Sequence, residues 1–107
     1  MDLKQYQIVI VNLDPTIGSE IRKTRPCVII SPNEMNKYLR TIVIAPLTFS
    51  DADYPTRVSV NFQNKVGRIA IDQIRTIDKA RVVKVKSPLT SNEIENIKQT
   101  IKDTFVL

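Results

Sequence analysis

The stretch Arg57-Val58-Ser59-Val60-Asn61-Phe62 alternates polar and apolar side chains without a break. Because successive side chains of a strand point to opposite faces, this pattern predicts a half-buried β-strand with its valines and Phe62 on the inner face. Other short runs rich in β-branched residues, bounded by turn-forming residues, predict five further strands. These cover residues 6–13, 27–31, 41–47, 67–74 and 81–85, and residues 33–38 fit one short helical turn.

The C-terminal end of the chain has a different period. Thr90-Ser91-Asn92-Glu93 has the pattern of a capping box, with Leu89 and Ile94 at the two positions of a hydrophobic staple. The pattern predicts one amphipathic helix over residues 91–105. Its apolar face consists of Ile94, Ile97, Ile101 and Phe105.

About six short strands followed by one helix predict a mainly β fold, a small and strongly bent antiparallel sheet or barrel with the helix packed on it. The pattern alone leaves an SH3-like barrel, an OB-fold and other small barrels open. The length of 107 residues predicts a single domain, residues 1–107, with a core large enough to fold without disulfides or a structural metal.

The composition excludes several kinds of site. With one Cys and no His, the chain has no Cys/His zinc site, no Ser-His-Asp triad and no histidine general base. The start of the chain lacks a secretory signal and no apolar run approaches the length of a membrane span, so we expect a cytoplasmic protein with no membrane contact. Cys27 lies in an apolar run and is expected to be a reduced core thiol rather than a nucleophile.

Positive charge is concentrated in the middle of the chain. Residues 57–86 contain eight lysines and arginines against two aspartates, and the whole chain has a net charge of +5. Such a cluster suits a polyanionic partner such as nucleic acid, although a solvated strand face with spare lysines explains the charge alone equally well.

Two segments carry residues that building a barrel does not require. Residues 12–26 form a long connection with three basic side chains, which suits either a functional loop or an ordinary hairpin loop. Residues 45–50 form a strand end that runs into a polar loop. If the two strands beside these segments are neighbours, Arg25 and Thr48 reach one rim of the sheet. An arginine and a hydroxyl suit RNA 2′-O transphosphorylation, in which the substrate supplies its own nucleophile.

Several motifs occur together in one order along nearly the whole chain, and the chain resembles the MazF/PemK family of toxin endoribonucleases. They are Asn12-Leu13-Asp14-Pro15-Thr16, Gly18-Ser19-Glu20, Lys23-Thr24-Arg25-Pro26, Val28-Ile29-Ile30-Ser31, Ile44-Ala45-Pro46-Leu47-Thr48 and Asp72-Gln73-Ile74-Arg75-Thr76-Ile77-Asp78.

The resemblance implies an SH3-like barrel that forms a homodimer and cleaves single-stranded RNA at a short sequence. Cleavage would need no metal or cofactor and would leave a 2′,3′-cyclic phosphate and a 5′-hydroxyl. The resemblance also implies inhibition by a small acidic antitoxin of the MazE/PemI kind, with DNA binding in the company of that antitoxin. RNA and an acidic peptide both suit a basic surface.

The same resemblance assigns roles to individual residues. Arg25 matches the catalytic arginine and Thr48 the catalytic threonine of the family. Asp72 matches a position that some members use as a candidate general base. The residues that match the mobile loop or the RNA path are Ser19, Glu20, Thr24, Leu47, Phe49, Ser50 and Gln73.

Some positions depart from the family pattern. Ala70 replaces the arginine that accompanies the candidate base, so a structural ion pair of Asp72 with Arg68 or Arg75 is the favoured interpretation. The pair Arg22-Lys23 stands where many relatives have a glycine and one basic residue. Two other functions stay open: a toxin that binds a protein target such as gyrase without catalysis, and an inactive descendant that binds RNA without cutting it.

Overall fold

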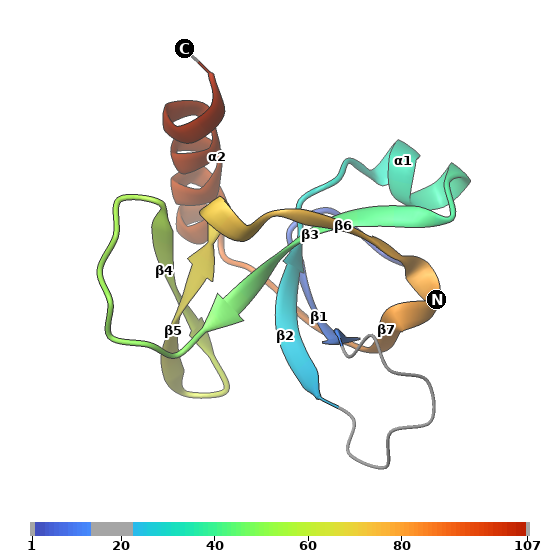
Figure 1. Cartoon of the computed structure of the whole chain (residues 1–107), viewed down its shortest axis with the longest axis horizontal. Helices are drawn as coiled ribbons and strands as arrows, with labels where there is room; N and C mark the ends of the chain where they lie inside the picture. Colours follow the sequence, from blue (N-terminus) through green and yellow to red (C-terminus); the bar gives the residue numbers. More distant parts are fainter. Residues whose placement is uncertain (1, 14–22, 107) are drawn as a thin grey trace.

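The computed structural model describes residues 2–13 and 23–106 (Figure 1). Within these residues lie seven strands, two α-helices and two short 3₁₀ helices. In chain order they are β1 (Gln7–Asn12), β2 (Thr24–Ile29), α1 (Asn33–Tyr38), β3 (Thr41–Thr48), β4 (Arg57–Phe62), β5 (Lys65–Ala70), η1 (Ile71–Gln73), β6 (Arg75–Asp78), η2 (Lys79–Arg81), β7 (Val82–Pro88) and α2 (Ser91–Phe105).

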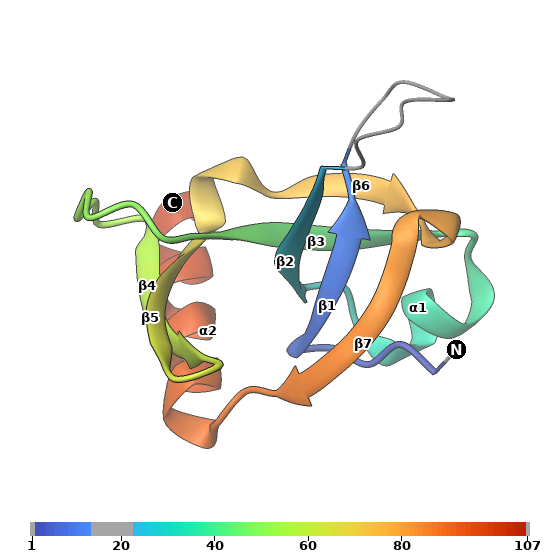
Figure 2. The same ribbon diagram turned by 90° about the horizontal axis from the view of Figure 1, so that it is seen from below.

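The strands form one strongly curled antiparallel sheet. Its order is β4-β5-β3-β2-β1-β7, with β6 also paired to β3. β3 is the long central strand: residues 44–46 pair with β2, residues 41–44 pair with β6, and residues 47 and 48 pair with β5. Figure 2 shows β3 running from the half that contains β1, β2 and β7 into the half that contains β4 and β5. The mainly β, barrel-like prediction is confirmed, as a curled half-barrel with a C-terminal helix.

The two faces of the central strands bury two separate apolar clusters. One cluster, called here the helix-side core, includes Leu47, Ile69 and Ile97 and lies between the sheet and α2. The other, the barrel core, includes Cys27, Ile29 and Ile44. Val28 belongs to the helix-side core, whereas its neighbours Cys27 and Ile29 belong to the barrel core, so β2 is buried on both faces. This explains why its sequence is a continuous apolar run instead of an alternating one.

The predicted strand over residues 67–74 is wrong in its bounds. β5 begins earlier, at Lys65, and the 3₁₀ turn η1 separates it from β6, a strand that the periodicity did not predict. Both β5 and β6 pair antiparallel with β3, and the turn between them allows the two to follow the bend of β3. The sheet therefore has seven strands rather than about six.

The predicted C-terminal helix is confirmed over residues 91–105, and so is its capping box. Thr90 Oγ1 accepts a hydrogen bond from the Glu93 amide at 3.3 Å, and Glu93 Oε1 accepts one from the Thr90 amide at 2.9 Å. Ile97 is fully buried and Ile94 packs against the helix-side core. Phe105, predicted to lie on the apolar face, is 56% exposed, because the helix runs beyond the sheet that covers its first turns (Figure 1).

Candidate functional site

Arg25 and Thr48 lie two residues beyond the last pair of the β2–β3 ladder, one on each strand. The β2–β3 ladder pairs Ile29 with Ile44 and Cys27 with Pro46. Extending it by two residues sets Arg25 opposite Thr48. Alternate residues of a strand share a face, so both side chains belong to the face of the barrel core, at its rim.

β2 and β3 separate just where these two residues lie, and Pro26 supplies a physical reason. The Ile30 amide donates to the Val43 carbonyl at 2.8 Å, so even-numbered residues of β2 direct their backbone groups toward β3. Proline has no amide hydrogen, so the ladder has no donor at position 26. From Leu47 onward, β3 pairs with β5 on its other edge. We call the unpaired region between the start of β2, with Arg25, and the end of β3, with Thr48, the wedge. Figure 1 shows these two strand ends diverging.

Hydrogen bonds to its own loop hold the Thr48 hydroxyl. Thr48 Oγ1 accepts a hydrogen bond from the Ser50 amide at 3.2 Å, and Ser50 Oγ accepts one from the Ala52 amide at 3.2 Å. A threonine hydroxyl has one hydrogen to donate. Because the Ser50 bond uses only an acceptor position of Oγ1, that hydrogen is left for a ligand.

Two more arginines lie on the face of β3 that carries Thr48. Arg68 of β5 is the cross-strand partner of Thr48, and Arg75 of β6 is the partner of Ile44. The charges of Arg25 and Arg75 both lower the pKa of the Cys27 thiol. Within residues 2–13 and 23–106, none of the three arginines forms an ion pair. Sequence reasoning considered Arg68 and Arg75 only as partners of Asp72, because strand register is not visible in the sequence.

Asp72 forms a structural ion pair, but with a different partner from those predicted. Arg57 Nε donates to Asp72 Oδ1 at 2.9 Å, and the Thr56 hydroxyl donates to the same oxygen at 2.9 Å. The hydrogen bond from Arg57 holds the pKa of Asp72 below its usual range. A carboxylate with a lowered pKa is a weaker proton acceptor, so these contacts argue against a general-base role. Arg57 rather than Arg68 or Arg75 is the partner because β4 and η1 meet there.

Leu47 and Phe49 were both expected along the RNA path. Their side chains lie together beside Gly67, on the face of β5 opposite to the one that carries Arg68. Leu47 is only 1% exposed and belongs to the helix-side core, so its side chain does not face a ligand. A Cβ on Gly67 would lie 2.8 Å from Leu47 Cδ1 and 3.1 Å from Phe49 Cε1, so the absent side chain gives both room. Phe49 is 40% exposed, with the Lys65 ammonium 4.8 Å from its ring centre. Phe49 is therefore accessible to a ligand, whereas Leu47 serves packing.

The remaining predicted site residues fall into two groups. Thr24, Ser50 and Gln73 are exposed, at the start of β2, in the loop after β3 and at the end of η1. Ser19 and Glu20 lie outside the described residues. The long connection is shorter than predicted, because Thr24 and Arg25 already pair with Asn12 and Val11 in the β1–β2 ladder.

Cys27 is a core thiol, as expected. The residue is completely buried in the barrel core, and burial raises the pKa of its thiol to about 12, against a smaller opposing effect of Arg25 and Arg75. A protonated, inaccessible thiol is a poor nucleophile. Among the described residues, no group of three or more His, Cys, Asp or Glu side chains is placed to hold a metal ion.

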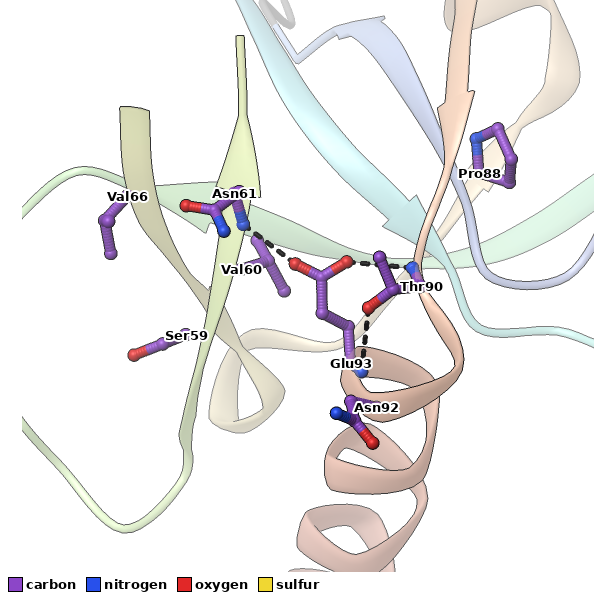
Figure 3. Close-up of a pocket in the computed structure, with 8 residues that line it drawn as sticks. All are labelled: Ser59, Val60, Asn61, Val66, Pro88, Thr90, Asn92 and Glu93. Atoms are coloured by element: carbon purple, nitrogen blue, oxygen red, sulfur yellow. Dashed lines mark hydrogen bonds between the residues drawn. The ribbon is translucent and has the colours of Figure 1, made fainter. Parts of the chain in front are cut away.

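A hollow of about 420 Å³ lies away from the predicted residues, between β4 and the start of α2 (Figure 3). Glu93 lies at its centre, where Oε1 accepts from the Thr90 amide and Oε2 accepts from the Asn61 amide at 2.8 Å. Both carboxylate oxygens are thus used in capping α2 and fastening it to the edge strand β4. The position of Glu93 is therefore explained by its contribution to the stability of the fold.

A family model described as a PemK-like, MazF-like toxin of type II toxin-antitoxin systems matches residues 4–105. The chain belongs to this toxin family. One relative, from Staphylococcus saprophyticus subsp. saprophyticus, is named endoribonuclease MazF. It is 30% identical over 105 residues, covering 92% of this chain and 88% of that protein.

Solved structures of family members share the fold. MazF from Deinococcus radiodurans superposes with a TM-score of 0.82 at 18% identity, over 100% of this chain and 99% of that one. A mycobacterial endoribonuclease in complex with its cognate antitoxin also gives 0.82, at 20% identity, over 97% and 95% of the two chains. No helix in the described part of this MazF/PemK-family chain is long and apolar enough to span a membrane.

Proposed function

We propose that this chain is an endoribonuclease toxin that cleaves single-stranded RNA, with Arg25 and Thr48 as its catalytic residues. The observation that carries the proposal is that β2 and β3 stop pairing at Cys27 and Pro46, while the strand register assigns Arg25 and Thr48, just beyond this point, to the same face of the sheet. The relative named endoribonuclease MazF supports the same activity.

The reaction requires little from the protein. The 2′-hydroxyl oxygen of the substrate attacks the adjacent phosphorus and loses its proton to water. The bond from phosphorus to the 5′-oxygen breaks, and that oxygen takes up a proton. The products are a 2′,3′-cyclic phosphate and a 5′-hydroxyl. The protein accelerates this step by holding the phosphate and stabilising its extra negative charge.

Arg25 suits the charged part of that task. A guanidinium keeps its charge at all relevant pH values and donates through a planar fork that fits two phosphate oxygens. Arg25 is exposed at the rim and unpaired among the described residues, so its donors are open to a ligand. Thr48 donates its single hydroxyl hydrogen to a non-bridging oxygen, since the Ser50 amide already occupies an acceptor position of Oγ1.

The substrate path follows the basic and exposed residues around the wedge. Thr24, Phe49, Ser50 and Gln73 contact the nucleotides that flank the cut, with the exposed Phe49 ring as a stacking surface for a base. Ser19 and Glu20, which lie between β1 and β2 in the sequence, act on the same substrate. Arginines that form no ion pair with the described residues suit both RNA phosphates and the tail of an acidic antitoxin.

The proposal includes the assembly and setting of the protein. Residues 1–107 act as one domain, two copies form a homodimer, and the toxin works in the cytoplasm without a metal or cofactor. Structural neighbours described as complexes with a cognate antitoxin or with MazE support an antitoxin partner.

The test is incubation of the purified, antitoxin-free protein with a long single-stranded RNA in excess EDTA, followed by sequencing of the cut ends and chemical typing of the termini. We expect discrete cuts with cyclic phosphate and 5′-hydroxyl ends. Tight RNA binding without any cut would support an inactive binder. Growth arrest with intact cellular RNA would support a toxin that acts on a protein target.

A further inference from the structure

Arg68 is the direct cross-strand neighbour of Thr48. It lies on β5, opposite Thr48 on one side and opposite Ser59 of β4 on the other. Directly opposed residues of a sheet have Cβ atoms about 5 Å apart and share a face. The side chain of Arg68 therefore begins beside Thr48, whose hydroxyl takes part in the proposed reaction.

The contacts of Arg68 lead to Thr48 through one intermediate residue. Arg68 Nη1 donates to the Ser50 carbonyl at 3.0 Å. The amide of the same Ser50 donates to Thr48 Oγ1 at 3.2 Å. Arg68 thus holds the residue that orients the threonine hydroxyl. Ser50 is exposed, and in the described part of the chain no other side chain fastens its carbonyl to the sheet.

One atom of the Arg68 side chain lowers the stability of the fold. Its side-chain Nε is buried and has no hydrogen-bond partner among the described residues. An unpaired buried donor lowers the stability of a fold, and an apolar side chain of similar length removes that cost together with the bond to Ser50.

We propose that Arg68 is a positioning residue for Thr48: it fixes Ser50, and Ser50 in turn fixes the acceptor side of the Thr48 hydroxyl so that its hydrogen points to the substrate phosphate. This role rests on the proposed RNA cleavage. It assigns a function to an arginine that carries a charge beside the wedge but has no ion pair within the described residues.

The test is a double-mutant cycle of Arg68→Met and Thr48→Val on the full-length protein. Single-turnover cleavage of an RNA with a known cut site measures the chemical step, and the same RNA with a 2′-deoxynucleotide at the cut measures binding. Lys98→Met on α2 removes one positive charge from an exposed position and serves as the matched control. Arg68→Lys keeps the charge and tests whether one donor to Ser50 suffices.

We expect Arg68→Met to slow cleavage about tenfold, with binding changed no more than by Lys98→Met and with an unchanged or higher melting temperature. In the Thr48→Val background the same substitution should change the rate by less than about twofold, because the group that Arg68 positions is gone. Arg68→Lys should recover part of the rate. Effects that multiply in the double variant, or an unchanged rate in Arg68→Met, would overturn the proposal.

A second measurement does not depend on cleavage. Hydrogen exchange of the Ser50 amide, followed by NMR, reports its bond to Thr48 directly. We expect this amide to exchange faster in Arg68→Met and at the wild-type rate in Lys98→Met. If the wild-type protein does not cut RNA, the proposed function fails, and the Ser50 amide still decides the role of Arg68: faster exchange supports it and unchanged exchange overturns it.

Discussion

Arg57 Nε donates to Asp72 Oδ1 at 2.9 Å, and this bond joins the first residue of β4 to the 3₁₀ turn between β5 and β6. Arg57 also lies over the ring of Tyr54, with its guanidinium carbon 5.1 Å from the ring centre. The two contacts fasten the loop after β3 to the turn that carries Gln73. They give Asp72 a structural role in joining β4 to η1.

Asp72→Asn should leave cleavage within about threefold of wild type, because a carboxylate with a lowered pKa is a weak proton acceptor. A loss of a hundredfold or more, measured in the same single-turnover assay, would show that Asp72 takes the proton. A shift of the alkaline or acidic limb of the pH–rate profile in the variant would point the same way.

The same substitution should have a pH-dependent effect on stability. The pKa of Asp72 is lowered in the folded protein, so the pair stabilises the fold fully above the pKa of the unfolded carboxyl, near 4, and loses that effect as the pH falls through the folded value. The two groups are partly exposed, so we expect at most about 1 kcal/mol. Denaturant unfolding of wild type and Asp72→Asn should differ at pH 7, and the difference should shrink as the pH falls through the lowered pKa of Asp72.

Arg25→Ala should abolish cleavage while the fold stays intact. The side chain is exposed and makes no ion pair within the described part of the chain, so its removal costs the core nothing. Circular dichroism and the oligomeric state in solution serve as controls. Full activity in the folded variant would remove Arg25 from the catalytic assignment.

Thr48→Val should lower the cleavage rate at least about tenfold, equivalent to about 1.4 kcal/mol in the barrier, because it deletes the hydroxyl donor that faces the phosphate. Valine keeps the β-branched shape that suits the end of β3. The rate should be compared at saturating protein concentration, so that a change in binding does not enter. A wild-type rate would show that Thr48 only packs.

Pro26→Ala should restore an amide hydrogen that points toward β3. The β2–β3 ladder can then extend toward Arg25 and Thr48 and narrow the wedge, so we expect cleavage to fall while the melting temperature holds or rises. Amide exchange at position 26 of the variant measures the new bond. Unchanged cleavage together with a protected amide at that position would show that the wedge does not need to be open.

Cys27 should resist alkylation in the native protein. Its thiol is fully buried, and its pKa of about 12 keeps it protonated at neutral pH. Mass spectrometry after iodoacetamide treatment should show modification only once the protein is unfolded. Rapid labelling of the folded protein at pH 8 would contradict the core assignment.

Several features could be predicted from the sequence because they depend on local chemistry. The alternation in residues 57–62 reflects one buried and one exposed face, and the capping box at Thr90 and Glu93 satisfies helix amides by residues three apart. Several motifs in one order along the chain, among them the one around Arg25 and Pro26, indicated the family. The hairpin turn between β4 and β5 was missed, since Gln63 and Asn64 take positive φ angles of 52° and 62° without the glycine that signals such turns.

Local patterns in the sequence were enough to predict the mainly β class, the C-terminal helix and the pair Arg25 and Thr48, on which the proposed chemistry depends. The folded chain was needed to show what surrounds that pair. Strand register brings Arg68 beside Thr48 and Arg57 to Asp72, and the bend of β3 buries Leu47. Neighbours across a sheet are set by pairing between residues far apart in the chain, and a shift of one position in that pairing exchanges the two faces.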